Sequence, residues 1–236
     1  MIHSLIKMLF PNRCVACGEI IDEGDFLCEY CLEFLERCQK DRLCLKCGCN
    51  KKECQCKYRV YSFDGITAPF YYDGIAKIAM FHFKFRKKPH YGRFFAENMA
   101  LAYKQSFNDV KFDYIVYVPM YPLRQSKRGY NQSEILAREL GEILHIPVLD
   151  NVLFCRRKNK RQHLTALKER FDNVRGIYYT DLKLNGETFL LIDDIKTTGA
   201  TLGECSKTLM KAGAGRVYCL VGLTTNKRKK GKKNGN

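Results

Sequence analysis

From about residue 62 onward, apolar residues occur in short runs that alternate with longer stretches of helical periodicity. The short runs are rich in β-branched and aromatic residues, and they predict strands at residues 66–72, 114–118, 188–193 and 216–225. The longer stretches predict helices at residues 75–83, 94–106, 133–144 and 200–212. Gly213 follows the last of these helices and is expected to cap it. The last two strands are almost continuously apolar, as in parallel strands buried on both faces, so this segment is predicted to be an α/β domain.

The pattern differs in the first sixty residues, where cysteines take the place of apolar periodicity. Ten of the 13 cysteines lie between Cys14 and Cys56. A segment this short buries too little apolar surface to fold alone, so bound metal is expected to hold it together. We predict three parts: a zinc-ribbon module at residues 1–60, the α/β domain at 61–226 and a basic disordered tail at 227–236.

Paired CxxC turns indicate the chemistry of the first part. Two cysteines that flank a tight turn can direct both sulfurs at one ion, and two such turns supply the four thiolates of a tetrahedral structural zinc site. Because no export signal is recognisable, a reducing compartment is expected, and it disfavours a disulfide framework. The predicted zinc ligands are Cys14, Cys17, Cys28 and Cys31 at the first site, and Cys44, Cys47, Cys54 and Cys56 at the second.

The second site has more candidate ligands than coordination places. Cys38 and Cys49 compete with its four predicted ligands, and Cys49 is the favoured substitute for Cys54 or Cys56. We therefore expect one or two structural zinc ions. A closed four-thiolate site has no open coordination position, so neither metal is expected to be catalytic. The three cysteines beyond residue 60 are expected to be ordinary thiols.

Composition and charge indicate a folded, soluble chain that binds polyanions. Of the 236 residues 46% are apolar, and no apolar run approaches the roughly 20 residues of a membrane-spanning helix. The first ten residues are apolar, but Lys7 interrupts them and no small-residue cleavage site follows. They predict a short amphipathic lead-in packed on the next domain, in a cytoplasmic protein without membrane insertion. The net charge of +16 lies almost wholly after residue 60, which favours nucleic acid or a phosphorylated small molecule as partner.

The most informative stretch runs from Phe189 to Thr201: a buried strand, two adjacent carboxylates, a turn of small residues and the start of a helix. Hydroxyl groups and backbone N–H groups at a helix start suit a phosphate, because the helix dipole there favours negative charge. Gly199 allows close approach of a ligand to the backbone. Asp193 and Asp194, at the carboxyl end of the strand, suit a sugar diol and its metal better than a second anion.

Three groups of basic residues are further candidates, and each has a simpler alternative. Arg124, Lys127 and Arg128 follow a strand end, where open α/β sheets bind ligands, but they also fit a solvated basic loop. The run at residues 156–161 carries five positive charges, which is typical of a solvated or disordered loop. The cations at residues 84–88 alternate with aromatic residues, and fit either single-stranded nucleic acid or the solvent face of a core helix.

The stretch from Phe189 to Thr201 resembles the 5-phosphoribosyl-1-pyrophosphate (PRPP) binding motif of the type I phosphoribosyltransferases. Val118-Pro119, followed by Arg128-Gly129-Tyr130-Asn131-Gln132, is similar to the "VP…RGYNQ" element of ComF-family proteins, which are linked to natural competence. The double zinc ribbon, the Phe83-Lys84-Phe85 element and residues 162–176 are also similar to that family. The resemblance thus covers nearly the whole chain, and the crowded second knuckle and the basic tail depart from it.

The resemblance implies a type I phosphoribosyltransferase-like fold, in which a parallel sheet flanked by helices follows the small zinc-ribbon module. It implies that Asp193 and Asp194 bind the ribose hydroxyls of PRPP with Mg²⁺, that residues 196–201 hold the 5-phosphate, and that the turn after Val118 faces the pyrophosphate. In this fold a flexible loop near residues 156–161 closes over the site and supplies cations, which favours a lid there. The implied PRPP-binding residues are Asp193, Asp194, Lys196, Thr197, Thr198, Gly199, Ala200 and Thr201. The implied pyrophosphate or lid residues are Pro119, Met120, Arg124, Lys127, Arg128, Lys158 and Arg161.

Two functions are open at this point. The first is a ComF-type protein that binds PRPP and Mg²⁺, acts in DNA uptake or nucleotide metabolism and, if it is an enzyme, transfers phosphoribosyl to an unidentified acceptor. The alternative is a non-catalytic competence factor that senses PRPP or a nucleotide and binds single-stranded DNA. A competence-associated helicase is a further implied partner. Neither the acceptor nor the oligomeric state has a signal in the sequence.

Overall fold

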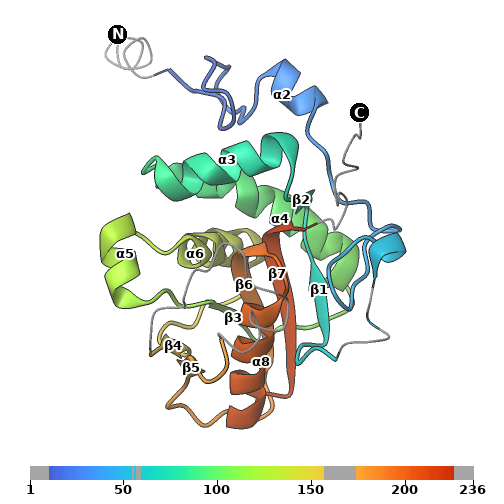
Figure 1. Cartoon of the computed structure of the whole chain (residues 1–236), viewed down its shortest axis with the longest axis vertical. Helices are drawn as coiled ribbons and strands as arrows, with labels where there is room; N and C mark the ends of the chain where they lie inside the picture. The colour runs from blue at the N-terminus through green and yellow to red at the C-terminus, as the bar shows by residue number, and fades with distance from the viewer. Residues whose placement is uncertain (1–10, 55, 57–59, 157–173, 226–236) are drawn as a thin grey trace, which may run out of the picture.

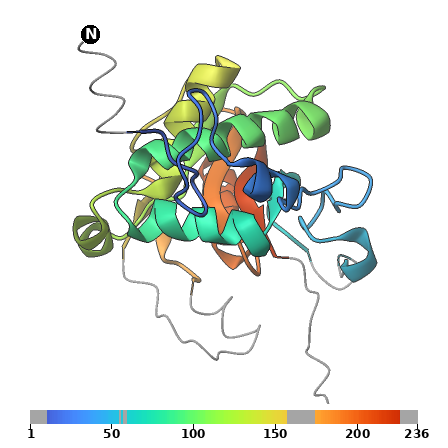
Figure 2. The same cartoon turned by 90° about the horizontal axis from the view of Figure 1, so that it is seen from above.

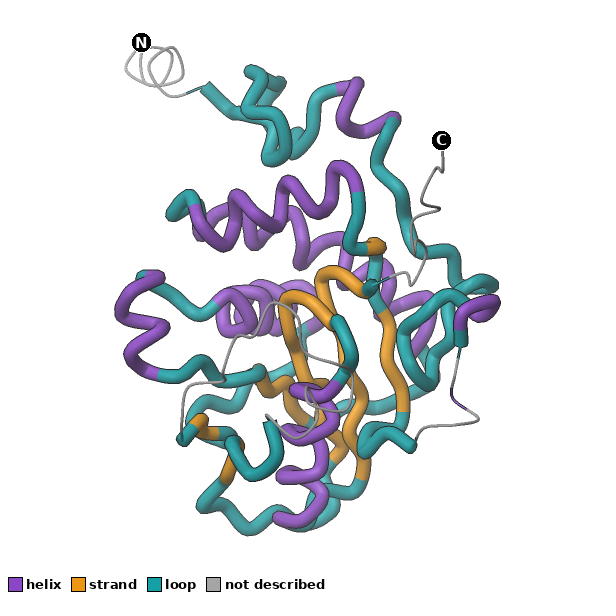
Figure 3. The backbone as a smooth tube through the Cα atoms, in the orientation of Figure 1, coloured by secondary structure: helices purple, strands orange, loops and turns teal. Residues whose placement is uncertain are grey.

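The computed structural model describes residues 11–54, 56, 60–156 and 174–225, and a parallel sheet lies at its centre (Figure 1). Its strands follow the order β1-β7-β6-β3, and every pairing between them is parallel. Their bounds are β1 Gly65–Thr67, β7 Arg216–Thr224, β6 Thr188–Lys196 and β3 Tyr114–Tyr117. The short β2 (Phe70–Tyr71) continues the pairing along β7. β6 and β7, of nine residues each, pair along their full length and form the middle of the sheet (Figure 3).

Helices cover both faces of this sheet. α4 (Gly92–Phe107) and α6 (Gln132–Leu144) contact one face, and α3 (Gly74–Phe85) joins the same core. α8 (Ala200–Ala212) packs on the opposite face. The remaining elements are short: α2 Glu29–Glu33, η1 Lys51–Glu53, η3 Pro89–Tyr91, α5 Pro122–Arg128, and the antiparallel pair β4 Phe154–Cys155 and β5 Tyr178–Tyr179.

The central strands supply two hydrophobic cores in alternation. On β6, Leu190 and Ile192 belong to the core with α3, α4 and α6, whereas Phe189 and Leu191 belong to the core with α8. Successive side chains of a strand point to opposite faces, so a strand covered on both sides must be apolar at every position. The predicted fold class is therefore confirmed in its main feature, a parallel sheet flanked by helices that follows a cysteine-rich segment.

Most predicted elements correspond to an observed one. The predicted strands at 114–118, 188–193 and 216–225 are β3, β6 and β7, and all four predicted helices are present as α3, α4, α6 and α8. Gly213 has a φ of 110° and caps α8 as expected. The prediction of one strand at 66–72 is wrong, because the chain forms β1 and then β2, with Pro69 between them, and proline has no N–H for a continuous ladder. The periodicity also missed α5.

The cysteine-rich segment packs on the α/β part in two places. Its first half lies over α3 and α4 (Figure 2), where Val15 and Leu27 enter the shared core and Nδ1 of His82 lies 3.2 Å from the carbonyl oxygen of Val15. Its second half lies beside β1, where the N–H of Ile66 donates to the carbonyl oxygen of Leu45 at 2.7 Å. The proposed boundary at residue 60 thus runs between two parts that bury apolar surface against each other.

Three sequence predictions lie outside the described residues: the amphipathic lead-in at residues 1–10, most of the basic run after Arg156, and the tail at 227–236. Within the described part of the chain, no helix is long and apolar enough to cross a membrane.

Candidate functional site

Two groups of cysteine sulfurs converge in the N-terminal segment. The members of each group lie within 4.8 Å of one another: Cys14, Cys17, Cys28 and Cys31 in the first cluster, and Cys44, Cys47, Cys54 and Cys56 in the second. The Sγ–Sγ distances include 3.6 Å between Cys17 and Cys28 and 3.8 Å between Cys44 and Cys56. Four sulfurs at about 2.3 Å from one tetrahedral zinc ion lie about 3.8 Å apart, so both donor sets fit zinc.

The two clusters contain the same eight cysteines that are predicted as zinc ligands from the sequence. Cys38 and Cys49, the two competing candidates, lie outside the second cluster. Burial raises the pKa of the Cys38 thiol to about 12. The sulfur of Cys49 instead accepts a hydrogen bond from Nζ of Lys196 at 3.1 Å. The clusters could therefore hold two zinc ions without either of these thiols.

The acidic pair near the end of β6 has two unlike members. Asp193 is buried, and its Oδ1 accepts hydrogen bonds from the Ser133 hydroxyl at 2.9 Å and from the Asp194 backbone N–H at 2.8 Å. Burial, and after it the charge of Asp194, raises the pKa of Asp193 to about 7. The Asp194 carboxylate forms an ion pair with Nζ of Lys84 at 2.7 Å and is less buried. Asp194 is thus the carboxylate that is better exposed to a ligand, and Asp193 supports it.

The turn between β6 and α8 has the geometry of an anion cradle. Gly199 has a φ of 81° and stands at the N-cap of α8, in a left-handed conformation that favours glycine. A Cβ atom at this position would lie 3.3 Å from the ring of Tyr61, so little space exists for a side chain. The N–H of Ala200 donates to Oγ1 of Thr198 at 3.3 Å. The turn leads into a helix of 13 residues, whose N-terminal N–H groups and dipole favour an anion.

The structure brings most of the predicted PRPP-binding residues together at this turn, with one exception. Thr197, Thr198 and Gly199 form the turn, and α8 begins with Ala200 and Thr201. Lys196 precedes it in sequence, but its side chain is only 2% exposed and its Nζ contacts Cys49. Its ammonium group therefore lies inside the protein, against the cysteine-rich segment.

The predicted pyrophosphate residues follow β3. Pro119 and Met120 line a cavity of about 520 Å³ together with Phe154 and Tyr179 of the β4–β5 pair. The guanidinium group of Arg156 lies 4.3 Å above the ring of Tyr179. The turn after β3 thus faces the strand pair that flanks residues 157–173, which lie outside the described part of the chain.

The basic residues of this group lie on α5 (Pro122–Arg128), which is capped by Gly129. Lys127 is exposed and Arg124 is half-buried. The guanidinium group of Arg128 lies 4.9 Å above the ring of Phe85 and donates to Oε1 of Gln132 at 2.7 Å, so it is held by protein groups. Lys158 and Arg161 lie outside the described residues.

Two residues of this site were missed from the sequence, Lys84 and Ser133. Lys84 forms the ion pair with Asp194, and Ser133 donates to Asp193. Both lie at elements that the family resemblance singles out: Lys84 is the centre of Phe83-Lys84-Phe85, and Ser133 directly follows Arg128-Gly129-Tyr130-Asn131-Gln132. The hydroxyl of Tyr130 donates to the carbonyl oxygen of Phe83, which joins these two elements beside the acidic pair.

These features define an α/β protein with a candidate sugar-phosphate site at one end of its parallel sheet and two cysteine clusters packed on that domain. No model of a known protein family matches the chain. It is 29% identical to Competence protein F of Haemophilus influenzae over 86% of this chain and 93% of that protein. It is 32% identical to DNA utilization protein YhgH of Escherichia coli K12 over 46% of this chain and 48% of that protein.

A third relative is Competence protein ComFC of Bacillus subtilis, which is 28% identical over 60% of this chain and 56% of that protein. These relatives confirm the predicted resemblance to the ComF family. Phosphoribosyltransferases are among the solved structures that it resembles. Glutamine PRPP amidotransferase from Bacillus subtilis has a TM-score of 0.39 and 19% identity over 59% of this chain and 30% of its own. Adenine phosphoribosyltransferase from Leishmania donovani has a TM-score of 0.35 and 11% identity over 66% of this chain and 75% of its own.

Proposed function

We propose that this protein binds PRPP with Mg²⁺ at the end of β6 and acts in the use of DNA taken up by the cell. The observation that carries the proposal is the position of an acidic pair near the end of β6, shortly before a left-handed glycine turn and the N-terminus of α8. A carboxylate suits the two ribose hydroxyls, and a helix start suits a phosphate. The names of the relatives, which refer to competence and to DNA utilization, support the cellular role.

In this proposal each group has one task. Asp194 accepts hydrogen bonds from the ribose hydroxyls. The Asp193 carboxylate holds Asp194 in place by accepting a hydrogen bond from the Asp194 backbone N–H. The N–H groups at the start of α8 bind the 5-phosphate, and the turn at Pro119 and Met120 faces the pyrophosphate. Carboxylate oxygens are ligands that Mg²⁺ prefers, so the acidic pair fits the metal as well. Bound Mg²⁺ supplies positive charge that stabilises the departing pyrophosphate.

If the protein is an enzyme, the bond between the anomeric carbon and pyrophosphate breaks and a bond to the acceptor forms, while the acceptor loses a proton. The protein contributes position and charge, and Lys84 is a cation beside the acidic pair. A pyrophosphate-release assay with PRPP, Mg²⁺ and a panel of nucleobases, amines and single-stranded DNA tests turnover. Release above the background without acceptor identifies an enzyme, and its absence with intact PRPP binding identifies a sensor.

Ligand binding itself is tested by thermal unfolding. PRPP with Mg²⁺ at 100 times the dissociation constant stabilises a protein by about 2.7 kcal/mol if only the folded state binds. We expect this stabilisation in the wild type and its loss in Asp194→Asn. The exposed Glu142→Gln on α6 serves as the matched control and should keep it. Equal stabilisation of the wild type and Asp194→Asn would place the ligand elsewhere.

A second candidate function is binding of single-stranded DNA along α3. Phe83 is buried, but Phe81 and Phe85 are 49% and 50% exposed, and their ring centroids lie 5.1 Å apart. The residues that follow, Arg86 to Lys88, are exposed cations. Exposed aromatic rings beside cations suit stacking on bases, worth about 1–3 kcal/mol per base. The aromatic residues of this element thus divide between core and surface, and the exposed rings support this candidate.

Fluorescence anisotropy with labelled oligonucleotides tests this candidate. Phe81→Ala and Phe85→Ala should each weaken binding about tenfold, in keeping with the loss of one stacked base. The matched control is Leu101→Ala, which removes an exposed apolar residue of α4. If all three variants bound the oligonucleotide with the affinity of the wild type, α3 would be excluded as the binding surface.

A further inference from the structure

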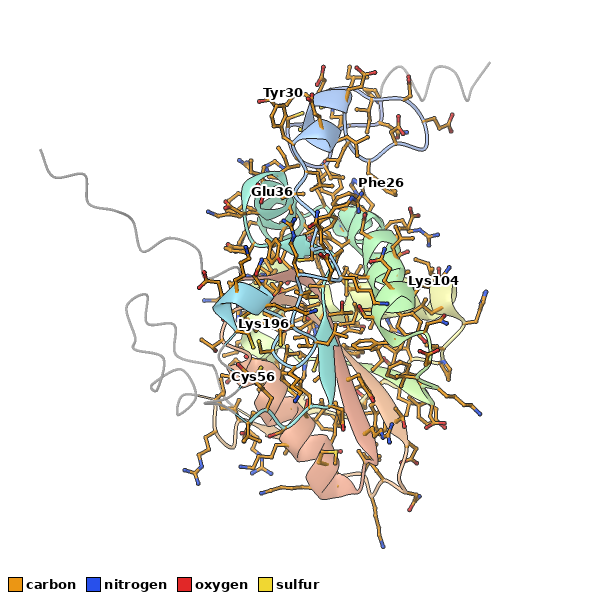
Figure 4. All side chains as sticks on the ribbon, turned by 90° about the vertical axis from the view of Figure 1, so that its right-hand side faces the viewer. Phe26, Tyr30, Glu36, Cys56, Lys104 and Lys196 are labelled. Atoms are coloured by element: carbon orange, nitrogen blue, oxygen red, sulfur yellow. The ribbon has the colours of Figure 1, made fainter. Side chains whose placement is uncertain are left out.

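The second cysteine cluster lies directly against the start of the phosphate-binding turn. Lys196 is the last residue of β6, and its buried Nζ donates to the sulfur of Cys49 at 3.1 Å. Cys49 is itself buried and stands between the cluster members Cys47 and Cys54. Figure 4 shows Lys196 and Cys56 on the same side of the molecule, next to η1. Residues 147 positions apart thus join the cluster to the site.

Backbone contacts strengthen this junction. The hydroxyl of Thr224, at the end of β7, donates to the carbonyl oxygen of Gly48. The N–H of the next residue, Thr225, donates to the carbonyl oxygen of Lys196 at 3.0 Å. The Thr225 hydroxyl donates to the carbonyl oxygen of Thr197 at 2.9 Å. The cluster, the end of β7 and the turn therefore form one continuous set of hydrogen bonds.

A buried ammonium group is costly unless a partner accepts its hydrogen bonds, so Lys196 depends on the place of Cys49. Cys49 in turn depends on the cluster, because the regular structure of the described residues around it is limited to short helical turns such as η1. A bound metal is what fixes the conformation of such a segment. We propose that the second cluster positions the phosphate-binding turn, and that Cys49 and Lys196 are the positioning residues that link the two. That the turn binds a phosphate rests on the proposed function, whereas the link between the second cluster and the turn does not.

The first cluster offers an internal contrast. It packs on α3 and α4, through Val15 beside His82 and through Phe26, which Figure 4 labels. The ring centroid of Phe26 lies 5.8 Å from that of Phe94. None of the described contacts of this cluster reaches Lys196 or the turn after it. Loss of metal from the first cluster should therefore leave the turn ordered, whereas loss from the second should loosen it.

Hydrogen–deuterium exchange of the full chain tests this link without any ligand. The readout is exchange in peptides covering residues 196–201. Zinc content and exchange in the β6–β7 core are measured on the same samples. In Cys44→Ser, which removes a ligand of the second cluster, we expect about one zinc fewer and exchange of the turn at least about tenfold faster. In Cys17→Ser, which removes a ligand of the first cluster, we expect the same zinc loss with unchanged exchange in the turn.

Two further variants keep all eight cluster cysteines. Cys49→Val removes the acceptor of the Lys196 hydrogen bond at similar volume and should speed exchange of the turn while both zinc ions stay bound. Cys49→Ser keeps an acceptor and should restore slow exchange. PRPP titration of the same proteins should give weaker binding in Cys49→Val and near-normal binding in Cys49→Ser.

The possible outcomes separate the link from the proposed function. Unchanged exchange of the turn in both Cys44→Ser and Cys49→Val overturns the link, and so does an equal increase in Cys17→Ser. Loss of zinc in Cys49→Val also overturns it, because Cys49 would then be a metal ligand. The expected exchange pattern in a protein that does not bind PRPP supports the link and refutes only the proposed ligand.

Discussion

Replacement of Asp193 by Asn should make the unliganded protein more stable at neutral pH. Asp193 lies buried, with Asp194 next to it in sequence, so its ionised form is unfavourable in the folded state. Its Oδ1 accepts hydrogen bonds from Ser133 and from the Asp194 N–H. The amide oxygen of Asn can accept both, so the variant keeps these contacts and removes the charge.

The magnitude follows from the pKa of Asp193, which rises from an ordinary 3.8 to about 7 in the folded protein. Between these values the folded state binds a proton that the unfolded state has lost, so the free energy of unfolding falls as pH rises, by about 1.4 kcal/mol per pH unit. Over the whole interval this amounts to at most about 4 kcal/mol. The stability gained in Asp193→Asn should therefore be near zero at pH 4, grow as pH rises, and level off above pH 7.

Urea unfolding of wild type and variant at several pH values between 4 and 8 measures this difference. Both proteins contain the same cysteine clusters, so the pH dependence of metal binding cancels when the two are compared at each pH. Glu142→Gln, which removes an exposed carboxylate from α6, is the control and should differ little from the wild type at any pH. A variant that is less stable than the wild type at pH 8, or a difference independent of pH, would refute the reasoning.

Three further predictions concern the ion pair, the metals and the charge. Lys84→Met leaves the carboxylate of Asp194 without its cation, so unfolding in urea at pH 7 should show a loss of about 2 kcal/mol; no loss would mean that the pair does not stabilise the fold. Metal analysis of the purified protein should find two zinc ions per chain, because both clusters fit one; a ratio near one would remove the second site, and a ratio near zero with disulfides would remove both. Binding of single-stranded DNA should weaken steeply with salt, log K falling by about 0.7 per phosphate neutralised, and deletion of residues 227–236 should reduce that slope because it removes six cations. Undetectable binding at low salt would contradict the nucleic-acid interpretation of the basic charge.

Local patterns predicted the elements that local physics controls. β6 and β7 are nearly continuous apolar runs because both faces are covered, and this pattern is visible without the fold. The first cysteine quartet follows from CxxC spacing, because each turn brings two sulfurs together over a few residues. α5 was missed although it has signals at both ends, Pro122 at its first turn and Gly129 after it, because its exposed face carries no apolar periodicity.

The sequence alone determined the α/β class, the first cysteine cluster and the contiguous stretch of acidic pair, glycine turn and helix start, since these depend on neighbouring residues; which four of six cysteines form the second cluster was decided by the folded structure. Only the tertiary structure decided how that stretch is surrounded. The folded chain pairs Lys84 with Asp194 and joins Ser133 to Asp193. It also directs the side chain of Lys196 toward Cys49 and away from the phosphate-binding turn. Such contacts connect residues far apart in the chain, and no local spacing encodes them, because they form only when the packing of helices on the sheet brings the side chains together.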